Sequence, residues 1–93
     1  MVRAVVTISG RVQGVGFRAT VRDVAARHRV AGTVRNLREG SRLEIDVEGE
    51  RADVEAFLAD VLARPPRFAR IDAVDRRGAE PRGVLSFRDA PTV

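Results

Sequence analysis

The sequence predicts an α+β fold in which two helices cover one face of an antiparallel sheet. Two observations lead to this prediction. The spacing of apolar residues switches between alternating and helical along the chain, and the resulting elements follow the order strand, helix, strand, strand, helix, strand. Right-handed crossover connections place both helices of this order on the same face of the sheet. The prediction is therefore a ferredoxin-like βαββαβ sandwich, with a short additional strand at the end.

The first part of the chain predicts a strand and a helix joined by a glycine-containing segment. Ala4, Val6 and Ile8 alternate with other residues, so the even positions of this strand should face a core. Residues 10–16 interrupt the pattern. Apolar or small residues then recur at helical spacing and predict a helix over residues 18–28. The residues expected on its core side are Phe17, Val21, Val24, Ala25 and His28.

The rest of the chain predicts a hairpin, a second helix and two closing strands. Residues 31–37 and 43–47 have strand patterns and flank turn-forming residues at 38–41. Pro65 and Pro66 end the second helix, and residues 70–74 and 83–87 predict the last strands. The core stripe expected on the second helix consists of Val54, Phe57, Leu58, Val61 and Leu62.

Length and composition indicate one globular domain over residues 1–93, because a chain of this size cannot supply a second core. The absence of cysteine excludes disulfides and thiolate metal sites. Arg3 and Arg11 interrupt the amino terminus before a signal-peptide core accumulates, and no stretch is long enough to span a membrane. We therefore expect a cytoplasmic protein with no membrane partner.

Residues 10–18 carry the strongest chemical signal. Gly14 and Gly16 allow neighbouring backbone N–H groups to turn inward, and the start of the following helix adds a positive dipole. Arg18 could direct two N–H donors onto the same anion. For the glycines alone, a flexible turn beside a surface arginine is the alternative. The net charge of +4 favours an anionic ligand, either a small phosphate or nucleic acid.

The complete string GRVQGVGFR at 10–18, followed by GTVRN at 32–36, resembles the signature of the acylphosphatase family. The resemblance extends over nearly the whole chain. It implies hydrolysis of a small acyl phosphate to a carboxylate and inorganic phosphate by a monomer that needs no cofactor. It also implies that Asn36 orients the attacking water and that a loop binds the phosphoryl group. That loop comprises Val12, Gln13, Gly14, Val15, Gly16, Phe17 and Arg18.

The chemistry of an acyl phosphate agrees with the few reactive groups available. The leaving carboxylate is a weak base, so positioning and charge stabilisation can suffice without a metal or a strong general base. The single imidazole, His28, falls on the core side of its predicted helix, where we expect a structural role.

The sequence departs from the family pattern at three positions. Ala19 replaces a common aromatic residue, Arg29 a glycine that ends the first helix, and Arg64 a glycine before Pro65. If the chain reverses at Arg29 through a left-handed conformation, the missing glycine should cost roughly 1 kcal/mol.

Two other classes of function remain as alternatives. A nucleic-acid-binding module shares the element order, but it would need aromatic residues on its central strands. The first strand has none, and the third is expected to expose Glu44, Asp46 and Glu48, which would repel phosphates. We therefore expect no nucleic-acid partner. A phosphate-binding domain without turnover is the second alternative, although simple binding would not need Asn36. A related domain occurs in larger carbamoyl-transferring hydrogenase maturation proteins, whose zinc motifs are absent here.

Overall fold

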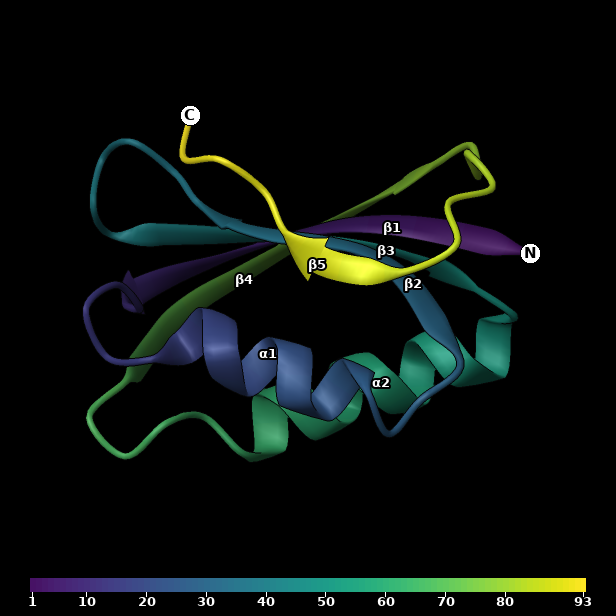
Figure 1. The fold of residues 1–93 in the computed structure, drawn as a ribbon. Coiled ribbons are helices and arrows are strands. Elements are labelled where there is room, and N and C mark those ends of the chain that lie inside the picture. Colours follow the sequence, from purple (N-terminus) through teal and green to yellow (C-terminus); the bar gives the residue numbers. More distant parts are fainter.

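The computed structural model describes all 93 residues and confirms the predicted order of elements. The five strands form one sheet in the order β4-β1-β3-β2-β5, and both helices lie on the same face of it (Figure 1). The four longer strands pair antiparallel as predicted, whereas β5 runs parallel to β2. The elements are β1 (Val2–Arg11), α1 (Phe17–Ala25), β2 (Val30–Asn36), β3 (Arg42–Gly49), α2 (Arg51–Ala63), β4 (Arg70–Ala79) and β5 (Phe87–Asp89).

The core lies between the sheet and the two helices. The even positions of β1 face this core as predicted, and they pair with the core-facing residues of β3, for example Val6 with Ile45. Burial of these apolar side chains is the main source of stability in a chain without disulfides. The fully buried helix residues that cover the sheet are Phe17, Val21, Val24, Val54, Phe57 and Val61. Neither helix is long and apolar enough to cross a bilayer.

Several boundaries differ from the predicted ones. Helix α1 ends at Ala25, because the amides of Arg27 and His28 bond three residues back, to the carbonyls of Val24 at 2.9 Å and Ala25 at 3.1 Å. Strand β4 continues to Ala79, and the last strand occupies 87–89 instead of 83–87. Leu62 lies at the edge of the α2 stripe and is exposed.

The expectation of a left-handed residue at Arg29 is wrong. No residue other than glycine has a positive φ, and the residue that caps α1, Ala26, is right-handed with φ −65°. The chain therefore leaves α1 through a tight right-handed turn that an arginine adopts without strain.

The carboxylates of β3 are not exposed, which also corrects an expectation from the sequence. Asp46 is 8 % exposed, and Arg3 donates to both of its oxygens at 2.9 and 2.8 Å. This hydrogen bonding to the Arg3 guanidinium holds the pKa of Asp46 below its usual value, although burial opposes the shift. Glu44 accepts from the Arg35 guanidinium at 2.9 Å. The alternating pattern identified their face of the sheet but not the arginines that cover it.

Glu48 holds the connection between β4 and β5, which we call the C-terminal strap (residues 80–86). Glu48 is only 1 % exposed, and its carboxylate accepts from the backbone N–H groups of Arg82 at 3.1 Å and Gly83 at 2.7 Å. The strap lies on the side of the sheet away from the helices (Figure 1). This contact directs the chain towards β2, where β5 pairs and carries Asp89.

Candidate active site

The loop between β1 and α1 is held in one conformation. Gly14 and Gly16 have φ values of +72° and +79°, in the left-handed region that glycine adopts without cost. Val12 and Phe17 anchor the ends of the loop in the core. The Gln13 side chain donates from Nε2 to the carbonyls of Leu37 at 2.7 Å and Arg42 at 3.0 Å. The loop is thereby fastened to the β2–β3 hairpin.

The backbone amides of this loop have no partners in the protein. None of the N–H groups from Val12 to Ala19 donates a hydrogen bond to another residue, and Thr20 N–H is the first that does, to the Gly16 carbonyl at 3.1 Å. Left-handed glycines followed by a helix start turn such amides towards a common point. Unpaired amides with a helix dipole behind them favour an anion.

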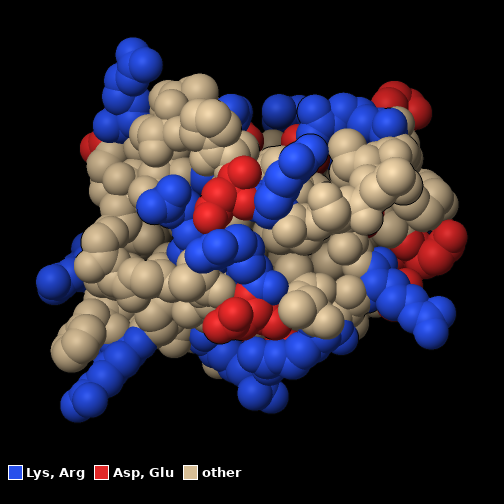
Figure 2. Space-filling model, in the orientation of Figure 1, with Lys and Arg blue, Asp and Glu red and all other residues tan.

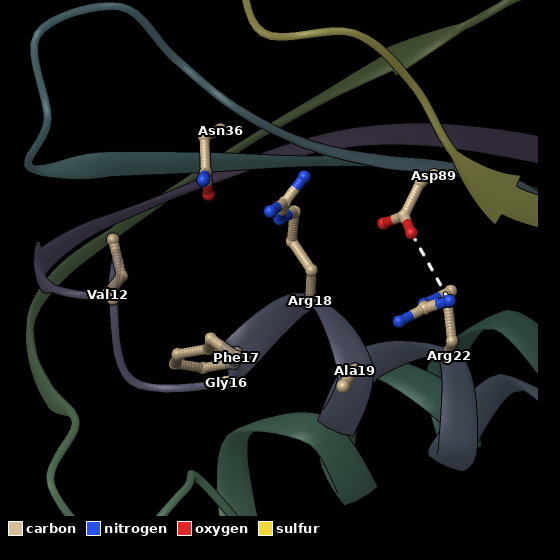
Figure 3. Close-up of a pocket in the computed structure, with 9 residues that line it drawn as sticks. Val12, Gly16, Phe17, Arg18, Ala19, Arg22, Asn36 and Asp89 are labelled. Carbon is tan, nitrogen blue, oxygen red and sulfur yellow. Dashed lines mark ion pairs between the residues drawn. The ribbon is translucent and has the colours of Figure 1, made fainter.

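A pocket of about 200 Å³ opens beside the loop (Figure 3). Arg18 projects into it from the first turn of α1 and makes no ion pair or side-chain hydrogen bond with any other residue. Its guanidinium is therefore free to bind an anionic ligand. The residues that line the pocket are Val12, Gly14, Gly16, Phe17, Arg18, Ala19, Arg22, Asn36 and Asp89.

Asn36 enters the pocket from the end of β2. Side chains alternate along a strand, so Asn36 lies on the same face as the fully buried Val34, towards the helices. Its Oδ1 atom is buried and has no hydrogen-bond partner. An unpaired buried acceptor costs about 1–3 kcal/mol, and in native proteins it often marks a place for a ligand or water.

The structure thus brings together most of the residues predicted for the site. Arg18, Asn36, Val12, Gly14, Gly16 and Phe17 all line one pocket. Gln13 and Val15 do not line it: the Gln13 side chain fastens the loop, and Val15 packs against the core. Their backbone amides nevertheless belong to the unpaired set described above.

Three pocket residues, Ala19, Arg22 and Asp89, were not assigned to the site from the sequence. Arg22 and Asp89 form an ion pair with 3.2 Å between Nη1 and Oδ2. Arg22 follows Arg18 by four residues, so helical spacing placed both on one face of α1 and could have indicated its role. Asp89 gave no such signal, because it lies beyond the predicted last strand.

The titratable groups with displaced pKa values lie outside the pocket. Hydrogen bonding from His28, at 3.1 Å, lowers the pKa of Asp60, and this contact shows the structural role expected of the histidine. Contact with Arg76 lowers the pKa of Glu55, and contact with Arg70 lowers that of Asp72. No group of three or more His, Asp and Glu side chains is arranged to hold a metal ion.

Comparisons with known proteins agree on one family. The family model named Acylphosphatase matches residues 4–88. An acylphosphatase from Anaeromyxobacter dehalogenans is 49 % identical over 84 residues, which cover 90 % of this chain and 88 % of that protein. The crystal structure of acylphosphatase from Bacillus subtilis superimposes with a TM-score of 0.89 at 30 % identity, covering 97 % of this chain and 99 % of that one.

The same domain occurs within a larger protein. The crystal structure of full-length HypF in the phosphate- and nucleotide-bound form matches with a TM-score of 0.90 at 35 % identity. The match covers 98 % of this chain but only 12 % of that chain.

Proposed function

Because this chain belongs to the acylphosphatase family, we propose that Arg18 and the loop amides hold the phosphoryl group of its substrate and that Asn36 positions the attacking water. The reaction itself follows from the family and the fold: the enzyme hydrolyses the carboxyl–phosphate anhydride of an acyl phosphate to a carboxylate and inorganic phosphate. The residue roles are our proposal.

Phosphoryl binding is assigned to the groups in the pocket that lack partners. The unpaired amides from Val12 to Ala19 and the free guanidinium of Arg18 supply donors from two directions to the non-bridging oxygens. The planar guanidinium can donate two parallel hydrogen bonds, which fix the orientation of the phosphoryl group as well as its place. Charge on these oxygens is then stabilised as the bond to the leaving group lengthens.

The observation that carries the proposal is the buried, unpaired Oδ1 of Asn36 in the same pocket as Arg18. This oxygen can accept a hydrogen bond from a water molecule and hold it in reach of the phosphorus. The water oxygen forms the new P–O bond while the bond to the acyl oxygen breaks, and both water protons remain on the product phosphate. The electron pair of the broken bond leaves with the carboxylate.

The same observation favours catalysis over phosphate binding alone. An anion is bound by hydrogen-bond donors, whereas Oδ1 is an acceptor. An acceptor beside the phosphoryl site can hold a water molecule, which phosphate binding alone does not require.

The nucleic-acid alternative is not favoured by the structure. The carboxylates of β3 are paired with arginines or strap amides, so they are no longer an argument against nucleic-acid binding. The face of the sheet on which such modules stack bases, however, is occupied by the Arg3–Asp46 pair and the C-terminal strap. Figure 2 shows basic and acidic groups interspersed on the face in view, without one continuous basic surface.

The test is release of carboxylate from benzoyl phosphate by the purified protein in the presence of a chelator. Since positioning and charge stabilisation carry the mechanism, we expect turnover to persist in chelator and to vary little across neutral pH. Loss of turnover in chelator, restored by a divalent ion, would contradict the proposed metal-free mechanism. Arg18→Lys is the sharpest variant here, because it keeps the charge and removes the planar fork; we expect it to lose both turnover and phosphate inhibition.

We also propose that the 93 residues act as one monomeric domain in the cytoplasm. A cysteine-free chain is compatible with a reducing compartment, and size-exclusion chromatography with light scattering tests the monomer.

A further inference from the structure

The pocket has two chemically different sides, which meet at Arg18. On one side lie Asn36 and the glycine loop, with their unpaired oxygen and amides. On the other lie Ala19 and the ion pair between Arg22 and Asp89 (Figure 3). The side chains of these three residues have no part in the division of labour proposed above, although the residues line the same pocket.

The geometry of phosphoryl transfer gives the second side a role. The attacking and leaving oxygens lie roughly in line through the phosphorus. If the water is held by Asn36, the acyl group must leave from the opposite side of the phosphoryl group. In the pocket, the side opposite Asn36 is that of Ala19, Arg22 and Asp89. Ala19 adds only a methyl group there, so the ion pair is the main chemical feature that an acyl group meets.

The charge on this side is balanced within the protein. Arg22 and Asp89 are partly exposed, with 45 % and 39 % of their side chains accessible, so both can be reached by a ligand. The Asp89 carboxylate neutralises Arg22, and both charged groups line the pocket that the acyl group enters. An acyl group with a second negative charge therefore meets the Asp89 carboxylate beside a guanidinium whose charge is already paired, and it finds no free cation on this side.

We propose that the Arg22–Asp89 pair forms the acyl-group subsite and that Asp89 is its specificity-determining residue, which makes the enzyme prefer uncharged acyl groups over acyl groups that carry a carboxylate. This inference rests on the proposed roles of Arg18 and Asn36. It identifies the class of substrate by its charge: the acyl phosphate of a monocarboxylic acid, as opposed to the monophosphate anhydride of a dicarboxylic acid.

The experiment is a charge series at the pair. The two probes are acetyl phosphate, with an uncharged acyl group, and succinyl phosphate, whose acyl group ends in a carboxylate. The measured quantity is the selectivity ratio, kcat/KM for succinyl phosphate divided by kcat/KM for acetyl phosphate. The proteins are the wild type, Asp89→Asn, Arg22→Gln and the double variant, so the formal charge of the pair is zero, positive, negative and again zero.

We expect the selectivity ratio to rise about fivefold in Asp89→Asn and to fall about fivefold in Arg22→Gln, the scale of a partly exposed charge pair. The double variant should return to within about twofold of the wild type. Asp72→Asn is the matched control: it removes the same charge from another arginine-paired aspartate, outside the pocket, and should leave the ratio unchanged. Circular dichroism melts confirm that each variant is folded.

A selectivity ratio that stays constant across the folded variants, or that shifts equally in Asp72→Asn, overturns the inference. Because the ratio is tested by two substitutions of opposite sign, failure of one variant to fold leaves the other to decide. The wild type separates this failure from that of the proposed function: if it hydrolyses acetyl phosphate but the ratio ignores the charge of the pair, only the subsite is wrong.

Discussion

Replacing Asn36 with alanine separates water placement from phosphoryl binding. The substitution removes Oδ1, the one buried side-chain oxygen or nitrogen that has no partner, so the folded state loses no hydrogen bond. We therefore expect the free energy of unfolding to change by less than about 1 kcal/mol. Turnover should respond much more strongly. Removal of one preorganised hydrogen-bonding group typically lowers kcat by about 100-fold or more, equivalent to about 2.7 kcal/mol of barrier.

The assay measures kcat for benzoyl phosphate together with the competitive inhibition constant of inorganic phosphate. In Asn36→Ala the inhibition constant should stay near the wild-type value, because Arg18 and the loop amides are intact. In Arg18→Ala both quantities should deteriorate together. Asn36→Asp keeps an acceptor oxygen but adds a negative charge beside the bound phosphoryl group, so phosphate inhibition should weaken in that variant. Near-normal kcat in Asn36→Ala, or unchanged phosphate inhibition in Arg18→Ala, would refute the division of labour.

Three further predictions concern stability. Asp46→Asn should lower the free energy of unfolding at pH 7 by about 2 kcal/mol, because it breaks the covered pair with Arg3. The folded pKa of Asp46 lies below its ordinary value of 3.8, so the stability that the ionised carboxylate adds is fully present above pH 3.8 and is lost as the pH falls through the folded pKa. In urea melts from pH 7 to pH 2, the free energies of unfolding of the wild type and Asp46→Asn should therefore converge in acid. Gly32→Ala should destabilise the protein severely, since an added Cβ at φ +146° would lie 1.8 Å from the Asp46 carbonyl oxygen. In Gly14→Ala the added Cβ meets open space, so the variant should lose only about 1 kcal/mol because of its left-handed backbone. Comparable denaturant midpoints for the two variants would contradict this. Arg29→Gly should lower the free energy of unfolding by roughly 0.5–1 kcal/mol instead of raising it, because the φ angle there is not positive and glycine adds only unfolded-state entropy; a denaturant melt measures the change.

The sequence predicted the fold and most of the site because both depend on local patterns. Alternation in β1 and helical spacing in α1 and α2 identified the core-facing residues, and the loop between β1 and α1 was recognisable from its glycines and Arg18. Asn36 reaches the same pocket as Arg18 because it ends β2, which pairs with β3 in the sheet that α1 covers.

What could not be predicted depends on contacts between distant residues. The carboxylates of β3 look exposed in an alternating pattern, and only the folded chain brings Arg3 onto Asp46 and the strap amides onto Glu48. Asp89 is the same kind of case, because its position in the pocket depends on the strap and on the parallel pairing of β5. The end of α1 was missed for a different reason: a turn whose amides bond three residues back has no glycine to mark it.

The parallel pairing of β5 with β2 also affects the order in which the parts of the pocket form during folding. Gly32 pairs with Phe87, and in β1 Arg3 pairs with Ala79, so the sheet closes by contacts between residues far apart in sequence. In such topologies the entropy of loop closure is lost before the long-range contacts form, so folding is slower than in helical bundles, whose contacts are local. The loop, Arg18 and Asn36 all lie within one contiguous stretch of the chain, whereas Asp89 arrives from its other end on a strand of three residues. The anion-binding half of the pocket is thus encoded early and locally, and the half that meets the acyl group is completed only when the last strand has docked.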